Sequence, residues 1–315
     1  MLLILKYQIR KTVTIPRNFY QGANGTKLCR TSLIFVLQVF SSYYCLKLTF
    51  HFQASAGVLQ YYEHFINDET VDIIVKETNQ YAEQSGNVAG KRKLKGKREW
   101  KPVSAHEMHL FLEISVLEGV IKKLEESMYS TKNASIETPF FRTIMLYNRY
   151  CEIKKYLHFV SNEAYNPENH PNTKLYKIWP ICEHLNKVYE NTITPERDIT
   201  RDEMLMLYKG HLSWHQYIPL KKVKFCIKKN VLSDSSSGYI WSFIIYTEKG
   251  TLFHPKFRSL SLPSQVVMTL IMPLLKQGYC ITLDNYYTSP ELCDILLTYQ
   301  TDVVGTVRQN KRIYL

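Results

Sequence analysis

The stretch "ITLDNYYTSPEL", residues 281–292, places a helix start directly behind the end of a strand. Ile281 and Leu283 alternate with polar residues as in a β-strand, and Asp284 follows at once. Ser289 and Pro290 are residues preferred at the N-cap and first turn, so they predict a helix there. A carboxylate at the mouth of a buried strand is costly to desolvate, so Asp284 is expected to meet a metal, a cation or backbone donors.

After Pro195 the apolar pattern changes from helical period to strand period. Three predicted strands cover residues 199–207, 223–233 and 239–247, with a turn "DSSSG" at 234–238. A helix at 263–278, a strand at 279–284, a helix at 289–299 and a strand at 302–308 follow. This order is that of a ribonuclease-H-like sheet, so the predicted fold class is α/β, with a mixed sheet behind an N-terminal helical region.

The region before Pro195 has helical period. Asn67 or Asp68 can cap one helix, and Ser104 with Glu107 forms a capping-box spacing before a second. Residues 138–159 predict a third helix, residues 166–173 a loop, and residues 175–191 a fourth helix that restarts at Pro180. We predict three parts: a disordered segment at 1–56 that is foreign to the rest of the chain, a helical region at 57–195 with a basic linker at 90–101, and the sheet domain at 196–315.

Residues 1–56 include an apolar, basic-flanked stretch that polar residues interrupt, so no membrane association is expected. A poor signal anchor, a strand pair and translated sequence foreign to the domain all fit it, and we favour the last. The seven cysteines are scattered without a C-x-x-C pair. This pattern argues against a disulfide framework and a cysteine zinc site, and for a reducing compartment.

The charge balance favours a polyanionic partner, because the formal net charge is +12. The linker holds a dense basic run, which is a solvated loop, a nuclear-import signal or a phosphate-contacting arm. We predict DNA as the partner, with low sequence specificity, and a nuclear location; a homodimer stays open and no small-molecule cofactor is expected. The candidate DNA-binding residues are Lys91, Arg92, Lys93, Lys95, Lys97, Arg98, Lys209, Lys221 and Lys222.

Two acids stand out in the predicted sheet. Asp202 shares a strand face with Met204 and Met206, and Asp284 lies where sites of open α/β sheets gather. Two such carboxylates can hold Mg²⁺ or Mn²⁺ for attack on a phosphodiester. The alternatives are a turn built by Asp284 and an ion pair of Asp202 with Arg201 or Lys209.

Two blocks, "DEMLMLYKGHLSWHQYIPLKKVKFCIK" and "TLDNYYTSPELCDILLTYQTDVVGTVRQNKR", closely resemble the best-marked blocks of the piggyBac transposase family, including its domesticated, transposable element-derived members. Three upstream helical segments look like its N-terminal blocks in the same order, so the resemblance covers residues 61–315. It implies a DDE-type, ribonuclease-H-like transposase that cuts and joins DNA with two divalent ions. Asp202 matches its first catalytic acid and Asp284 its second, and both are the expected metal ligands.

The departures from the family pattern concern the rest of its site. The third acid and the cysteine-rich zinc tail of the family lie downstream of Leu315, so we expect a truncated fragment with an incomplete sheet. Arg201 replaces an aliphatic residue and His211 a frequent arginine. These changes predict a catalytically degenerate protein that retains DNA binding. The alternatives are an active, metal-dependent transposase or nuclease whose third acid comes from elsewhere, and an interaction protein without DNA chemistry.

Overall fold

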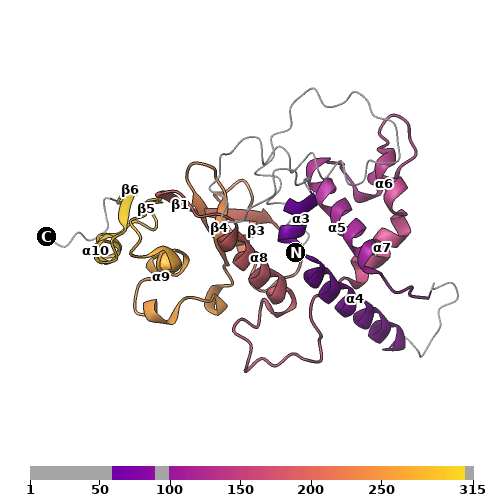
Figure 1. Ribbon diagram of the computed structural model, residues 1–315, viewed down its shortest axis with the longest axis horizontal. Helices are drawn as coiled ribbons and strands as arrows, with labels where there is room; N and C mark the ends of the chain where they lie inside the picture. Colours follow the sequence, from indigo (N-terminus) through magenta and orange to yellow (C-terminus); the bar gives the residue numbers. More distant parts are fainter. Residues whose placement is uncertain (1–58, 89–98, 309–315) are drawn as a thin grey trace. The chain divides into compact units, whose positions relative to one another are not determined.

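The computed structural model describes residues 59–88 and 99–308 (Figure 1). The predicted N-terminal segment at 1–56 and the basic residues from Lys91 to Arg98 lie outside the described residues. The described chain forms two compact units, one of residues 59–88, 99–170 and 175–182, the other of residues 171–174 and 183–308. No helix in the described part is long and apolar enough to cross a membrane.

Helices make up the first unit. Asn67 caps α4, since its Oδ1 accepts the Thr70 N–H at 3.0 Å, and the Ser104 side chain caps α5 through the Glu107 N–H at 3.2 Å. Both predicted helix starts are therefore confirmed. The elements are α3 (Leu59–Phe65), α4 (Asp68–Val88), α5 (Ala105–Val120), η1 (Glu126–Ser130), α6 (Pro139–Ile144), α7 (Tyr147–Tyr156) and η2 (Tyr176–Ile178).

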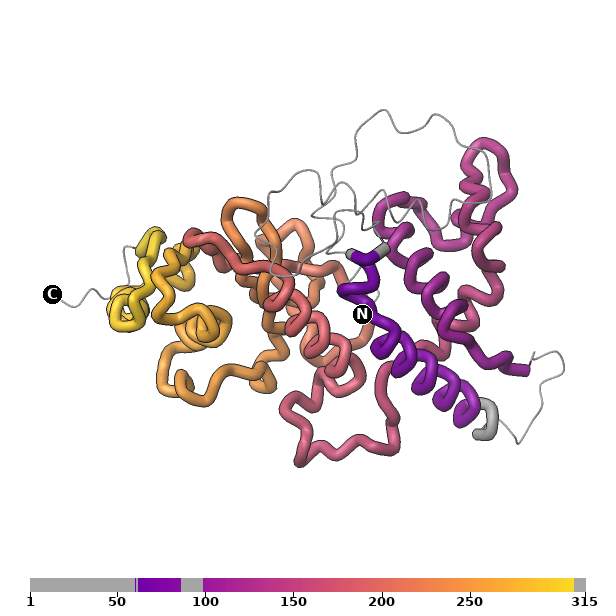
Figure 2. Tube along the Cα trace, viewed as in Figure 1, coloured from indigo at the N-terminus to yellow at the C-terminus, as the bar shows by residue number. Residues whose placement is uncertain are grey.

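The single helix predicted at 138–159 is wrong, because α6 and α7 are separated by two residues in extended conformation. Met145 has φ −147° and ψ 139°, and Leu146 has ψ 138°. Met145 is buried, so tertiary packing outweighs the helical pattern at this point. The loop predicted at 166–173 is confirmed, since residues 157–175 follow an irregular path in Figure 2.

The second unit is built on a mixed sheet with the strand order β2-β3-β1-β5-β6, in which β4 pairs with β3. β1 is antiparallel to β3 and parallel to β5. Each predicted strand and helix has a counterpart, but the helix predicted at 263–278 ends at Ile271 and the strand predicted at 302–308 ends at Gly305. β2 is an addition that the sequence did not predict. The elements are α8 (Trp179–Thr192), β1 (Asp198–Leu207), β2 (Gln216–Tyr217), β3 (Phe225–Asp234), β4 (Ile240–Ile245), η3 (Glu248–Gly250), η4 (Pro255–Phe257), α9 (Leu262–Ile271), η5 (Met272–Leu274), β5 (Cys280–Leu283), α10 (Pro290–Thr298) and β6 (Asp302–Gly305).

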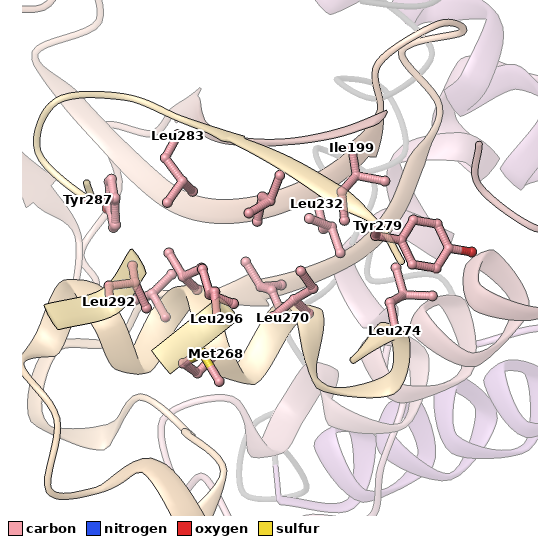
Figure 3. Close-up of a cluster of buried hydrophobic side chains, with 14 of the residues drawn as sticks. Ile199, Leu232, Met268, Leu270, Leu274, Tyr279, Leu283, Tyr287, Leu292 and Leu296 are labelled. Atoms are coloured by element: carbon pink, nitrogen blue, oxygen red, sulfur yellow. The ribbon is translucent and has the colours of Figure 1, made fainter. Parts of the chain in front are cut away.

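The core of this unit lies between the sheet and the helices α9 and α10. In Figure 3, Ile199 and Leu283 point from the sheet toward Met268 and Leu296 on the helices. All four side chains are buried. Their burial packs β1 and β5 side by side against the helices. In the register of this pair β5 ends level with the middle of β1, which continues to Leu207 in its pairing with β3.

Candidate active site at the carboxyl edge of the sheet

The register of β1 and β5 brings the two predicted acids to the same level. Asp198 lies opposite Cys280 and Thr200 opposite Thr282 in this parallel pair. Continuing that register by two residues places Asp202 level with Asp284, which directly follows the last residue of β5. Neighbouring strands lie about 4.8 Å apart, so the fold brings both acids to the sheet edge at which β5 ends, although β1 continues five residues further, to Leu207.

The Asp202 carboxylate is exposed and accepts the Glu203 N–H at 2.7 Å. Asp202 was expected to share its strand face with apolar side chains, and Met204 on that face is buried. Thr200, which precedes Asp202 on the same face, is only half-buried. The described residues contain no ion pair of Asp202. Arg201, one of its two predicted partners, lies 3.8 Å from Glu203 instead.

Asp284 is exposed as well, so the desolvation expected for it does not arise. Its Oδ1 accepts the N–H groups of Tyr286 at 2.9 Å and Tyr287 at 3.2 Å, and its backbone oxygen accepts Thr288 Oγ1 at 2.8 Å. Backbone donors are therefore the partner of this carboxylate, as in the turn-forming alternative. A turn of this kind still leaves the second carboxylate oxygen available to a ligand.

A polar cluster of five residues lies beside the two acids, and we call it the Arg201 cluster. Three members are buried and two are half-buried, in that order Arg201, Asn230, Tyr287, Glu203 and Lys228. The Tyr287 hydroxyl donates to Glu203 Oε1 at 2.8 Å, and Lys228 Nζ pairs with the same oxygen at 2.7 Å. The Arg201 guanidinium lies over the Tyr287 ring, 3.2 Å from its centroid, and donates to Asn230 Oδ1. Tyr287 thus joins the turn after β5 to β1.

Burial and charge shift the acidity of this cluster. Burial tends to raise the pKa of Glu203, but the bonds from Lys228 and Tyr287 lower it below its ordinary value. Burial also raises the pKa of Tyr287. Glu203 therefore stays ionised and Tyr287 neutral at physiological pH.

The predicted basic contacts Lys209, Lys221 and Lys222 are all exposed. They lie in the connection from β1 to β3, where Leu207 is opposite Cys226 and Tyr217 is opposite Phe225. This connection extends beyond the carboxyl end of β1 at Leu207, five residues further along the strand than Asp202. The other six predicted contacts lie outside the described residues.

An aromatic pair accompanies these lysines, and the sequence prediction missed it. Tyr217 is 57% exposed and Phe225 44% exposed, and their ring centroids lie 4.9 Å apart. The signal was a segment with three lysines between two aromatic residues, Tyr217 and Phe225, since aromatic rings beside basic residues are typical of nucleic-acid contact surfaces.

The residues at this edge fit a divalent cation as a partial ligand set. Asp202 and Asp284 would supply oxygen ligands, which Mg²⁺ and Mn²⁺ prefer. Within residues 59–88 and 99–308, no group of three His, Cys, Asp or Glu side chains could hold a metal ion. Asp302, a later acid, is opposite Cys280 at the start of β5 and pairs with Arg197 at 2.7 Å, so it lies at the other edge.

Comparisons with known proteins agree with this fold. A family model described as Transposase IS4 matches residues 59–314. The human PiggyBac transposable element-derived protein 2 is 26% identical over 252 residues, which cover 79% of this chain and 39% of that protein. The human PiggyBac transposable element-derived protein 3 is 24% identical over 251 residues, with the same shares.

A solved structure gives the same assignment. The chain superimposes on the piggyBac transposase in a cryo-EM synaptic complex with hairpin DNA, with a TM-score of 0.69 and 26% identity, covering 81% of this chain and 51% of that one. The ribonuclease-H-like, DDE-type fold class is thereby confirmed. The chain spans about two fifths of the curated relatives' length. With the family model matched over residues 59–314, this chain is a member of the piggyBac transposase family.

Proposed function

We propose that this chain is a piggyBac transposable element-derived protein that binds DNA with low sequence specificity and is catalytically degenerate. The observation that carries the proposal is the position of exposed Lys209, Lys221 and Lys222, which lie in the connection beyond the carboxyl end of β1. Asp202 in the middle of β1 and Asp284 directly after β5 precede that sheet edge. Lysines on such an edge neutralise phosphates without reading bases.

Two further observations support DNA as the partner. The formal net charge of +12 attracts polyanions, and the solved piggyBac relative is a complex with hairpin DNA. Exposed Tyr217 and Phe225 add flat rings on which bases can stack with little sequence preference.

The proposal of weak catalysis rests on the surroundings of the two acids. Asp202 and Asp284 would be the ligands of Mg²⁺ or Mn²⁺, which activates water or a 3′ hydroxyl when bound. Arg201, a buried cation, directly precedes Asp202 in β1 and stacks on Tyr287, which belongs to the turn that carries Asp284. The fixed positive charge of Arg201 opposes the binding of a metal cation at these two acids.

A second candidate function is metal-dependent DNA cleavage. The parallel register of β1 and β5, which places Asp202 at the same level as Asp284, favours it. It predicts Mg²⁺-dependent nicking of supercoiled DNA that disappears in both Asp202→Ala and Asp284→Ala. Nicking that survives either change would reject these acids as its source.

The test of DNA binding is a salt titration of a fluorescent duplex by fluorescence anisotropy. We expect affinity to fall steeply with salt for the parent protein. The triple variant Lys209→Gln, Lys221→Gln, Lys222→Gln should bind at least about tenfold more weakly, with a log–log salt slope smaller by up to about three.

The matched control is the triple variant Lys132→Gln, Lys187→Gln, Lys276→Gln, which removes the same charge from exposed positions elsewhere. It should keep most of the parent's affinity. Equal weakening by both triples would mean that net charge alone drives binding, and an unchanged affinity in the first triple would reject the proposed edge.

A further inference from the structure

Arg201 is a buried cation in the middle of β1. Its side chain is 1% exposed, on the β1 face that also carries buried Ile199, whereas the next residue, Asp202, is exposed. A guanidinium cannot lose its proton to relieve burial, so this charge is permanent.

Glu203, the carboxylate of the Arg201 cluster, pairs more closely with Lys228 than with Arg201. Glu203 Oε1 lies 2.7 Å from Lys228 Nζ but 3.8 Å from Arg201 Nη2. The Arg201 cluster therefore contains two cations and one acid.

The other contacts of Arg201 are with neutral groups. Nη2 donates to the Asn230 amide oxygen, and the guanidinium stacks on the Tyr287 ring. Among the residues that the structure describes, Nε and Nη1 of Arg201 have no hydrogen-bond partner. The positive charge is thus incompletely balanced by its immediate surroundings.

The two acids of the candidate site are linked to this charge through the chain and through Tyr287. Asp202 follows Arg201 directly in the chain. The Tyr287 N–H donates to Asp284 Oδ1, so the ring under the guanidinium belongs to the turn that carries Asp284. Burial lowers the pKa of Arg201, and the negative charges of Glu203 and Asp284 act against that shift.

We propose that Arg201 is the built-in counter-cation of the Asp202–Asp284 pair and weakens divalent-metal binding at these acids. The inference rests on the two-acid site of the proposed function. Because electrostatic interactions are strengthened away from water, a fixed charge beside the acids partly satisfies them and repels an incoming divalent ion. Arg201 is therefore a determinant of metal affinity that itself touches no metal.

The experiment is a Mn²⁺ titration of the full chain, followed by electron paramagnetic resonance of the free ion. Arg201→Gln removes the charge and keeps a polar side chain that can bond to Asn230, and it should bind Mn²⁺ about tenfold more tightly than the parent. Arg201→Lys keeps the charge and should stay within about threefold of the parent.

Two further variants secure the interpretation. Arg201→Met is neutral, keeps a long side chain over Tyr287 and should tighten Mn²⁺ binding as much as Arg201→Gln. Adding Asp202→Asn and Asp284→Asn to Arg201→Gln should abolish the tight binding, which places the ion at the two acids.

The possible failures can be told apart. Equal Mn²⁺ affinity in the parent and both neutral variants, with binding still lost on removal of the acids, would overturn the role of Arg201 and leave the two-acid site intact. Tightening in Arg201→Lys equal to that in Arg201→Gln would also overturn it, since charge would not be the cause. No binding in any variant would reject the two-acid site and this inference together.

Discussion

Asp234 is the last residue of β3, and its buried carboxylate accepts hydrogen bonds from the segment before β1 and from the turn after β3. Its Oδ1 accepts the Glu196 N–H at 2.9 Å, and its Oδ2 accepts Ser236 Oγ at 2.7 Å and Ser237 N at 2.8 Å. Burial tends to raise the pKa of Asp234, but these bonds lower it below its ordinary value. The residue therefore ties the β3–β4 turn to the segment that enters β1.

Asp234→Asn should lower the free energy of unfolding at pH 7 by about 2 kcal/mol, because the amide leaves buried donors unpaired. The folded pKa lies below the unfolded value of about 3.9, so the carboxylate contributes fully above that pH and its contribution disappears as pH falls through the folded pKa. Urea unfolding at several pH values between 7 and 3 should therefore show that the difference in free energy of unfolding between parent and variant becomes smaller as the pH falls.

Asp198→Asn, at the exposed start of β1, is the matched control and should change stability little at either pH. A difference between Asp234→Asn and the parent that stays constant with pH would contradict this account of the network.

The acids Asp202 and Asp284 could be selected from the sequence, because strand period and helix start signals set their places. The partners of Asp284 could be named only as alternatives, since an exposed carboxylate in a backbone turn and a buried metal ligand have the same local sequence. Arg201 stood out in the sequence as a charged residue in place of an aliphatic one. Its stacking on Tyr287 depends on a tertiary contact between residues far apart in the chain.

Helix α10 is the element that follows the candidate site, and Ser289 caps it by accepting the Leu292 N–H at 3.3 Å. Ser289→Ala should lower the free energy of unfolding by about 1 kcal/mol, and Ser289→Asn should restore most of it. Chemical denaturation of the three proteins tests this prediction. Equal stability of the alanine variant and the parent would show that α10 depends on its buried apolar face rather than on its cap.

Elements with a cap signal and a regular period were predictable, as α4, α5 and α10 illustrate. The break between α6 and α7 was not, because burial of Met145 selects an extended conformation that its local sequence does not encode. The two-residue strand β2 was missed for a related reason. A strand that short exists through its pairing with β3, which local periodicity cannot reveal.

At the scale of the molecule, the strand order could be anticipated because three strands followed by alternating helices and strands allow few topologies. The parallel register of β1 and β5 required the structure, since one residue of slip would move Asp202 away from Asp284. The basic run from Lys91 to Arg98 lies outside the described residues, so its part in DNA binding and the nuclear location stay predictions.

The central claim is that Asp202 and Asp284 form one site, and a double-mutant cycle on metal-dependent stability tests it most directly. The measurement is the rise in unfolding temperature caused by Mn²⁺ for Asp202→Asn, Asp284→Asn and the double variant, in both the parent and the Arg201→Gln background. We predict that each single change removes most of the rise and that the double change removes little more. Additive losses, or a rise that neither change affects, would contradict the claim.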